Sequence, residues 1–312
     1  MFEIVERKMI VPNLHLLVVR APEVIEEIQP GQFVIVHAGE GAERIPLSAA
    51  DWDHKEGTLT IVFMEVGTST GKLAMLKAGD TIPTVVGPLG KPTKIDRFGT
   101  VICIGGCFGM GSIFPVVRAL KKKGNVVITI MEGRSKNLLY WEDKLAEYSD
   151  KVIKLTRDGS YGYKGHINKG EDIIRETGIR PDRIIANGCM TLSYKTTQEY
   201  AHYDVPIIVT LNTIMIDGTG MCGVCRCTVN GKMKFACVDG PDFDGRYVDW
   251  EELAKRRKQY VGEEAFLVHH SGCGGNRYGR KENRELHQGR DAQTTAVYPA
   301  EKLPGSGTGI HS

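Results

Sequence analysis

The chain has 312 residues, a length that allows about two domains. Hydrophobic residues make up 41% and charged residues 25% of it, which excludes a disordered chain and a coiled coil. There are 40 Lys and Arg against 38 Asp and Glu, so the formal net charge is only +2. This balance gives no electrostatic reason to expect nucleic acid or an anionic membrane as a partner.

No apolar run approaches the roughly 18 residues of a membrane-spanning helix. The first residues, MFEIVERKMIV, alternate apolar and charged side chains and lack the basic, apolar and small-residue order of a signal peptide. We therefore expect a cytoplasmic protein whose first segment is a strand.

Short β-rich runs fill residues 1–97, among them LHLLVVR, FVIVHAG and TLTIVFMEV, with turn residues such as Pro30 and Gly31 between them. This spacing is typical of antiparallel sheets and predicts a β-barrel. The one helix signal lies over 69–77, where hydroxyl residues precede Leu73 and Leu76 on one helical face.

The pattern changes near residue 98. Apolar strand-like runs then alternate with helical runs such as SIFPVVRALKKK and KNLLYWEDKLAEY, which predicts a Rossmann-like parallel α/β domain over 98–211. A Cys-rich segment follows over 212–248. The last part, 249–312, reads as a short helix near 250–260 and a tail that is either disordered or ordered by a partner.

Four of the eight Cys fall within sixteen residues. Asp217, Cys222 and Cys225 give the spacing D-x4-C-x2-C, and Cys237 follows after eleven intervening residues. This is the plant-type [2Fe–2S] pattern with Asp in the first Cys position, so these four residues are the predicted cluster ligands. Cys227 is the competing fourth ligand. A tetrahedral zinc site made of the four Cys is the alternative, although C-x-C is an uncommon zinc spacing.

A glycine-rich turn, Gly105 to Gly111, follows the strand VICIG and precedes a helix, where backbone N–H groups can meet a pyrophosphate. Two further strands end at Arg134-Ser135 and at Gly188-Cys189. The carboxyl ends of parallel strands share one sheet edge, so we expect these three turns to form a dinucleotide site. A tight turn without a ligand is the plainer interpretation of the glycines.

The barrel contains two candidate flavin segments. Arg44 to Ser48 follows a strand, and Arg can pair with a phosphate while Ser can hydrogen-bond the flavin. Ser69 and Thr70 begin the predicted helix, where the plainer role is an N-cap. Taken together, the three segments describe an electron path from pyridine nucleotide through flavin to iron–sulfur.

The ordered motifs RIPLS, GTSTGKL, GPLG, GGCFGMG, EGRSKNL, DGSYGYKG, NGCM and DGTGMCGVCRC resemble the ferredoxin–NADP reductase superfamily over about residues 1–245. Within it, the chain is similar to the flavin and iron–sulfur electron-transfer subunits of the dihydroorotate dehydrogenase type. It is also similar to the small subunits of NADH-dependent reduced ferredoxin:NADP oxidoreductases, which share the Asp at the position of Asp217. The chain departs from many members at Asn187-Gly188-Cys189, where they read Cys-Gly-Pro.

The resemblance implies the cofactor-binding residues, and no catalytic side chain. For FAD they are Arg44, Ile45, Pro46, Leu47, Ser48, Val62, Phe63, Met64, Gly67, Ser69 and Thr70. For the dinucleotide they are Gly105, Gly106, Gly109, Gly111, Arg134, Ser135, Gly188 and Cys189. The dinucleotide is expected to be NAD(H), although Arg134 and Ser135 could also bind the 2′-phosphate of NADP(H).

The resemblance also implies the activity. Hydride passes from NADH to FAD, and single electrons then pass to a [2Fe–2S] cluster and on to a larger partner subunit. That partner carries a second flavin and [4Fe–4S] clusters, forms a heterodimer with this chain and couples ferredoxin, NADH and NADP(H) by electron bifurcation. The alternatives are the electron-transfer subunit of an NAD-dependent dihydroorotate dehydrogenase, and a non-catalytic zinc-containing module that responds to redox state.

Overall fold

The computed structural model describes residues 1–259. Its N-terminal part is a seven-stranded antiparallel sheet in the order β6-β1-β2-β5-β4-β3-β7. The strands are β1 (Phe2–Val11), β2 (Leu14–Arg20), β3 (Phe33–His37), β4 (Arg44–Asp53), β5 (Thr58–Met64), β6 (Thr81–Ile82) and β7 (Thr84–Leu89). Alternate residues of these strands form an apolar core that includes Leu17, Val34 and Ile61. This is the half-barrel predicted from the period-two pattern.

Two helices accompany this sheet. The predicted helix at 69–77 is present as α2 (Thr68–Met75), whereas α1 (Pro22–Glu27) was not predicted. Helix α1 has only six residues, and it buries Val24 and Ile25 against the barrel core. Such a short segment shows too little period for a sequence pattern to reveal it.

The second sheet has the order β11-β10-β9-β8-β12-β13-β16 and is parallel except for β16. Its strands are β8 (Thr100–Gly106), β9 (Val126–Gly133), β10 (Lys151–Thr156), β11 (Tyr163–Lys164), β12 (Arg183–Asn187), β13 (Ile207–Thr210) and β16 (Asp242–Asp244). Its helices are α3 (Gly109–Lys122), α4 (Glu142–Glu147), α5 (Ile167–Glu176) and α6 (Met190–Glu199), with 3-10 turns η1 (Lys136–Leu138) and η2 (Ala201–Tyr203).

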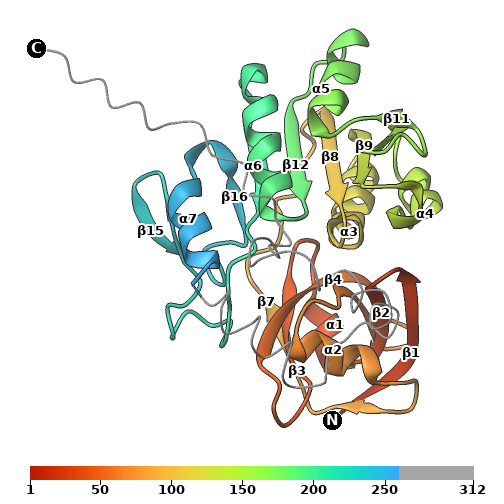
Figure 1. Ribbon diagram of the computed structural model, residues 1–312, viewed down its shortest axis with the longest axis vertical. Coiled ribbons are helices and arrows are strands. Elements are labelled where there is room, and N and C mark those ends of the chain that lie inside the picture. The colour runs from red at the N-terminus through yellow and green to blue at the C-terminus, as the bar shows by residue number, and fades with distance from the viewer. Residues whose placement is uncertain (260–312) are drawn as a thin grey trace, which may run out of the picture. The chain divides into compact units, whose positions relative to one another are not determined.

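Helices cover both faces of this sheet (Figure 1). Ile102 and Ile104 of β8 belong to the apolar cluster that contains residues of α5 and α6. Val101 and Cys103 of the same strand belong to the cluster that contains α3. In the central order β10-β9-β8-β12-β13, successive strands of the chain are added to one side of β8 from β9 to β10, and to its other side from β12 to β13. The position between β8 and β12 is therefore the topological switch point, where open α/β sheets bind ligands.

One predicted helix is interrupted. The run KNLLYWEDKLAEY forms η1 and α4 instead of one helix, because Trp141 between them has a left-handed backbone with φ 59°. No local feature predicts this, since bulky residues rarely adopt that conformation. Trp141 is held there by packing, and its ring makes an edge contact with Phe114 of α3 at a centroid distance of 5.7 Å.

The Cys-rich segment forms a two-stranded hairpin, β14 (Arg226–Val229) and β15 (Lys232–Phe235), followed by β16, η3 (Gly245–Tyr247) and α7 (Trp250–Arg257). Strand β16 pairs antiparallel with β13, so the segment adds an edge strand to the α/β sheet. Helix α7 fits the short helix predicted near 250–260. The predicted tail beyond it lies outside the described residues, and the domain boundaries at 97, 211 and 248 stay predictions.

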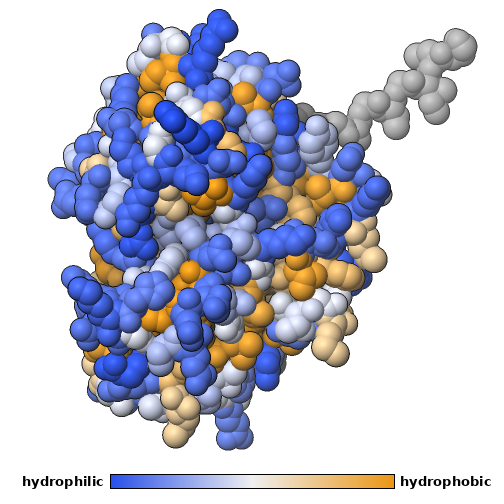
Figure 2. All heavy atoms as spheres, turned by 180° about the vertical axis from the view of Figure 1, so that it is seen from behind, coloured by the Kyte–Doolittle hydropathy of each residue, from blue (hydrophilic) through white to orange (hydrophobic). Residues whose placement is uncertain are grey.

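Every helix within residues 1–259 is too short or too polar to span a bilayer. The face shown in Figure 2 mixes hydrophilic and hydrophobic residues, in keeping with the balanced composition.

Candidate flavin, dinucleotide and cluster site

Residues of β3, β4 and β5 alternate between two sides of the barrel sheet. Leu47 and Phe63 point into the barrel core, where Phe63 stacks on the His15 ring at 5.6 Å. Arg44, Pro46 and Ser48 therefore lie on the outer side of β4. The side chains of Ile45, Leu47 and Phe63, although predicted to bind FAD, pack against or within the barrel core, so only their backbone is available on the outer side.

The start of α2 lies beside β4 and the loop before it. The Ser69 hydroxyl accepts a hydrogen bond from the Glu43 N–H at 2.7 Å. The Thr70 hydroxyl accepts from the Gly67 N–H at 3.0 Å and donates to the Gly67 carbonyl, so it caps the helix. Thr70 therefore uses its hydroxyl hydrogen at the helix start, whereas the Ser69 hydroxyl only accepts and keeps its O–H as a donor for a phosphate. The first N–H groups of α2 are further donors of this corner.

The glycine-rich turn after β8 packs tightly against the end of β12. A Cβ at Gly109 would lie 1.9 Å from the Asn187 carbonyl oxygen, and one at Gly106 would lie 2.5 Å from Leu192 of α6. Cys107 between them has φ 55°. Only glycine allows these two approaches, so the turn brings the N-terminus of α3 directly to the switch point.

Tyr140, in the segment between η1 and α4, supports this turn. Its hydroxyl accepts the Gly111 N–H at 2.8 Å and donates to the Phe108 carbonyl at 3.1 Å. Burial raises the pKa of this phenol far above its usual value, which keeps it protonated and able to donate. The Gly111 N–H also donates to the Phe108 carbonyl at 3.1 Å, so Tyr140 shares in satisfying an N–H group at the start of α3.

A buried carboxylate lies at the same sheet edge. Glu132, at the end of β9, is 3% exposed and pairs through Oε1 with Arg157 Nε at 2.7 Å. His166 Nε2 lies 3.8 Å from the same oxygen. Oε2 would lie 3.3 Å from a Cβ at Gly106, so this oxygen faces the glycine-rich turn. The carboxylate is thus oriented toward the switch point by Arg157.

Cys107 connects the glycine-rich turn to the barrel. Its Sγ lies 2.9 Å from the Met64 Sδ at the end of β5. Burial raises the pKa of Cys107 to about 11, so the thiol is neutral at pH 7 and does not act as a thiolate nucleophile. A Cβ at Gly111 would lie 3.2 Å from Val62, also on the outer side of β5. The predicted dinucleotide turn thus contacts predicted flavin residues.

The other predicted dinucleotide residues follow the ends of β9 and β12. Arg134 is exposed and Ser135 partly buried directly after β9. Gly188 follows β12, and Cys189 is the N-cap residue of α6. The structure therefore brings all three predicted turns to one edge of the sheet.

Asp217 organises the cluster loop. Its carboxylate accepts the N–H groups of Thr219, Met221 and Cys222, the last at 2.7 Å. Partial burial acts to raise the pKa of Asp217, but these hydrogen bonds outweigh it and lower the pKa below its usual value. Gly218, with φ 76°, and its neighbours let the chain turn tightly enough for this arrangement.

The predicted ligands fall into two pairs. The Cys222 thiol hydrogen-bonds the Asp217 carboxylate, and the Sγ atoms of Cys225 and Cys237 lie 3.1 Å apart. Cys237 is also influenced by the charge of Asp217. Two pairs of ligands suit a cluster in which each of two irons takes two protein ligands.

Cys227 lies apart from Asp217. Its electrostatic neighbours include Cys225, Asp239 and two residues of α7, Glu252 and Arg256, and it is 1% exposed in the apolar core. The choice between a [2Fe–2S] cluster and zinc, and that between Asp217 and Cys227 as the fourth ligand, stay predictions.

The cluster loop touches the outer side of the barrel. A Cβ at Gly218 would lie 2.9 Å from Ile35 of β3. Ile35 is paired with Pro46 of β4. Directly opposed residues of an antiparallel pair point to the same side, with Cβ atoms about 5 Å apart. The loop therefore lies one strand away from the predicted flavin residues.

A buried hydrogen-bond chain joins these parts. Asp242 of β16 accepts the hydroxyls of Thr93 and Thr210 at 2.5 and 2.6 Å. The single Thr210 hydrogen can go instead to Asn187 Oδ1 at 2.7 Å, and the Asn187 amide donates to Ser112 of α3. The chain links the cluster segment to the glycine-rich turn.

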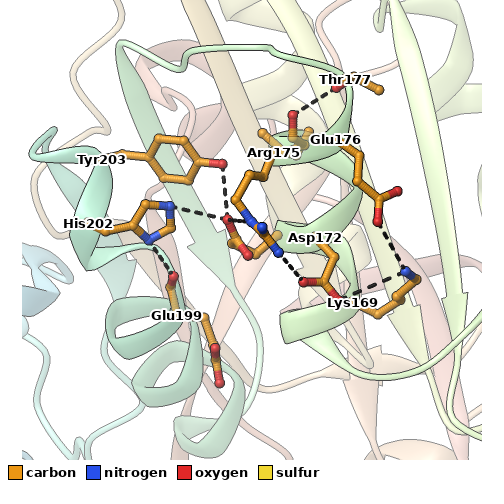
Figure 3. Close-up of polar contacts among 10 residues, drawn as sticks. Lys169, Asp172, Arg175, Glu176, Thr177, Glu199, His202 and Tyr203 are labelled. Carbon is orange, nitrogen blue, oxygen red and sulfur yellow. Dashed lines mark hydrogen bonds and ion pairs between the residues drawn. The ribbon is translucent and has the colours of Figure 1, made fainter.

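A separate polar cluster on α5 and η2 is shown in Figure 3. Glu171 there is contacted by Tyr203 at 3.2 Å, His202 at 3.2 Å and Arg175 at 3.5 Å. These groups satisfy one another and fix η2 to α5, so the cluster is structural.

Comparison with known proteins shows which family the chain resembles. The family model for the iron–sulfur cluster binding domain of dihydroorotate dehydrogenase B matches residues 212–249. A Thermotoga maritima homolog of the dihydroorotate dehydrogenase B (NAD(+)) electron transfer subunit is 43% identical over 263 residues, covering 84% of this chain and 92% of that one. An uncharacterized Clostridium beijerinckii protein is 38% identical, covering 88% and 98%.

Solved structures extend the comparison. An NADH-dependent reduced ferredoxin–NADP oxidoreductase, described for flavin-based electron bifurcation, has a chain that is 41% identical, with a TM-score of 0.82 and coverage of 86% of this chain and 97% of that one. A Neisseria gonorrhoeae ferredoxin NADP+ reductase is 17% identical, with a TM-score of 0.53 and coverage of 65% and 91%, and shows the fold alone.

The barrel, the α/β sheet and the cluster loop define an iron–sulfur flavoprotein oxidoreductase subunit with a ferredoxin reductase-like fold. The chain belongs to the family of dihydroorotate dehydrogenase B electron-transfer subunits. The iron–sulfur domain and the reductase fold fit the predicted FAD, [2Fe–2S] cluster and NAD(H).

Sequence reasoning missed Glu132, Arg157 and Tyr140. Glu132 and Arg157 end neighbouring strands β9 and β10, and polar residues at adjacent strand ends were the available signal. Tyr140 had no signal, because it caps a helix that begins 31 residues earlier.

Proposed function

We propose that the chain is the electron-transfer subunit of a flavin-based electron-bifurcating NADH-dependent ferredoxin:NADP oxidoreductase. The observation that carries the proposal is that all three predicted cofactor segments meet or lie on the outer side of the barrel sheet. It meets the dinucleotide turn at Met64 of β5, carries Arg44, Pro46 and Ser48 on β4, and meets the cluster loop at Ile35 of β3. Three neighbouring strands thus connect the three proposed cofactor sites.

The residues act by binding and orientation. When bound, FAD accepts the hydride of NADH and gives single electrons to the cluster, so the cofactors supply the redox chemistry. Arg44 would pair with an FAD phosphate, and the free N–H groups at the start of α2 would bind the same pyrophosphate. Ser48 would hydrogen-bond the flavin, and Val62 and Met64 would line it.

The dinucleotide would bind at the switch point. The N-terminus of α3 would meet its pyrophosphate, and Arg134 and Ser135 its adenosine ribose. Gly188 and Cys189 would lie near the nicotinamide. Glu132 Oε2 would accept a hydrogen bond from the carboxamide N–H, since this oxygen faces the turn and Arg157 holds the other.

Glu132→Gln tests this placement. Hydrogen bonds to a charged group contribute about 1.5–3 kcal/mol, so we expect the KM for NADH to rise by about tenfold with FAD content unchanged. Glu142→Gln removes a carboxylate on α4 that pairs with Lys154, and serves as the control. An unchanged KM in Glu132→Gln would place the carboxamide elsewhere.

The cluster ligands are proposed to be Asp217, Cys222, Cys225 and Cys237. Cys237→Ser is expected to lose iron, and Cys227→Ser to retain both irons, because Cys227 lies apart from Asp217. Asp217→Cys is expected to retain iron but to shift the visible spectrum and the reduction potential, because a thiolate is a softer ligand. Iron loss in Cys227→Ser together with an unaltered spectrum in Asp217→Cys would exchange the two assignments.

The partner is proposed to be a larger subunit with a second flavin and [4Fe–4S] clusters. Large apolar side chains are exposed around the cluster loop, with Ile216 44%, Met221 88% and Val238 38% exposed. Exposed apolar side chains gathered beside a redox centre favour a protein partner there. Co-purification of the subunits, followed by NADH- and ferredoxin-dependent NADP+ reduction by the complex, tests the function.

The second candidate is the electron-transfer subunit of an NAD-dependent dihydroorotate dehydrogenase. The family model over 212–249 and the name of the Thermotoga maritima relative favour it. Asp217 in place of the first cluster Cys argues against it. A co-purified complex that oxidises dihydroorotate with NAD+ would establish this candidate instead.

A further inference from the structure

A small hollow lies between the segment after β13, the cluster loop and α7. Thr213, Val224, Arg226, Arg256 and Arg257 line it, and its volume is about 90 Å³. One water needs about 10–15 Å³ of such space, so the hollow admits several waters or one tetrahedral oxyanion. No part of the proposed electron path uses it.

The hollow has concentrated positive charge. Arg226 Nη1 donates to the Gly223 carbonyl at 3.2 Å and Arg256 Nη2 to the Val224 carbonyl at 3.0 Å, so the cluster loop orients both guanidinium groups. Within residues 1–259, other arginines form ion pairs with carboxylates, among them Arg118, Arg157 and Arg246. None of these ion pairs includes Arg226, Arg256 or Arg257. Each guanidinium keeps further N–H donors for a ligand.

A buried hydroxyl completes the lining. Thr213 is 8% exposed, and its Oγ1 has no hydrogen-bond partner among the described residues. A buried hydroxyl without a partner costs about 1–3 kcal/mol. Oγ1 itself exposes less than 1 Å², so Thr213 lines the hollow through its other atoms. A rotation about χ1 would bring the hydroxyl to a bound group with acceptor atoms and remove this cost. Glu252, on the same helix as Arg256, does not line the hollow.

We infer that this hollow is an oxyanion-binding site, which takes a phosphate or carboxylate group. Guanidinium groups bind these planar or tetrahedral oxyanions through paired N–H donors, and a hydroxyl adds a third contact. A bound oxyanion would contact both Thr213, which follows β13, and the loop between Cys222 and Cys225. The inference stands on the lining residues and does not depend on the proposed electron path.

Calorimetric titration of the FAD-loaded full-length protein with inorganic phosphate tests the site. Saturating NAD+ fills the dinucleotide phosphate site, and chloride keeps the ionic strength constant. We expect one phosphate site, with a Kd raised by about tenfold in Arg257→Gln and in Thr213→Val, since each loses a hydrogen bond to a charged group. Lys258→Gln removes one positive charge from the end of α7 without lining the hollow and should change the Kd less than twofold.

Among the residues that the structure describes, no hydrogen bond joins the Arg257 side chain to the backbone, unlike those of Arg226 and Arg256, so Arg257→Gln should fold normally. Absence of phosphate binding to the wild-type subunit, or an equal loss in Lys258→Gln, would overturn the inference. Repeating the titration on the complex with its partner identifies the source of the oxyanion. Retained phosphate binding indicates a solute, and loss of binding in the complex together with weaker assembly of Arg257→Gln indicates a partner carboxylate. Iron content and visible spectra report the cluster separately.

Discussion

Gly109→Ala tests the contact between the glycine-rich turn and the switch point. A Cβ there would lie 1.9 Å from the Asn187 carbonyl oxygen, 2.4 Å from its carbonyl carbon and 2.7 Å from the Gly188 Cα. All three atoms belong to the backbone. Since real Cβ contacts are not shorter than 3.0 Å, the oxygen alone must move by 3.0 − 1.9 = 1.1 Å.

Overpacking of a rigid site costs about 1–3 kcal/mol, and a clash with backbone places this variant near the upper end, about 3 kcal/mol. One kcal/mol corresponds to about 2–4 °C in a domain of this size, so the melting temperature should fall by about 6–12 °C. The shift of Asn187 and Gly188 should also weaken NAD+ binding by about tenfold or more, while FAD stays bound.

Circular dichroism during thermal unfolding and NAD+ titration of flavin absorbance measure the two effects. Gly67→Ala is the control for thermal unfolding alone, since Gly67 is itself a predicted FAD residue; no atom lies within 4 Å of its added Cβ and its φ of −164° is open to any residue. It should cost about 1 kcal/mol at most, as the loss of a preferred helix-capping residue. A melting temperature of Gly109→Ala within 2 °C of the control would refute the tight approach of α3 to β12.

Two further substitutions report on the same domain. Tyr140→Phe removes the hydroxyl bonded to the Gly111 N–H, and should lower the free energy of unfolding by about 1 kcal/mol in chemical denaturation. An unchanged value would mean that the second bond of this N–H, to the Phe108 carbonyl at 3.1 Å, suffices. In Asp150, the hydrogen bond from Lys121 and that from the Val127 N–H lower the carboxyl pKa. The stabilisation is therefore present above the unfolded pKa of about 3.9 and lost as pH falls through the lowered folded value, so Asp150→Asn should melt below wild type at pH 7 but equal it near pH 2. A constant difference across this range would contradict the assignment.

The sequence predicted those features that depend on local spacing. The D-x4-C-x2-C register predicted the loop around Asp217, because a tight loop and its ligands are consecutive in the chain. The glycine-rich turn after VICIG predicted the switch point for the same reason. Strand alternation predicted the two sheets, since each strand shows its own period.

Features that depend on contacts between distant segments were not predictable. The choice between Asp217 and Cys227 stays a prediction, although the pairing with Lys234 sets the side of β14 to which the Cys227 side chain points. The Thr70 hydroxyl looked available to donate to a phosphate, but it donates to the Gly67 carbonyl at the start of α2. Residues with consecutive numbers on a strand, such as Phe63 beside Met64, face opposite sides, and only the assembled sheet shows which side is which.

The pairing of β16 with β13 has a consequence for how the holoprotein is made. Asp242 to Asp244 follow Cys237 by only a few residues, and their backbone hydrogen bonds attach the end of the Cys-rich segment to a sheet whose parallel strands come earlier in the chain. Within the same segment, Asp217 accepts the N–H groups of Thr219, Met221 and Cys222, so hydrogen bonds of the polypeptide set the path of the loop. We therefore expect chelation of the iron to leave the segment folded, and a loss of circular dichroism on chelation would contradict this.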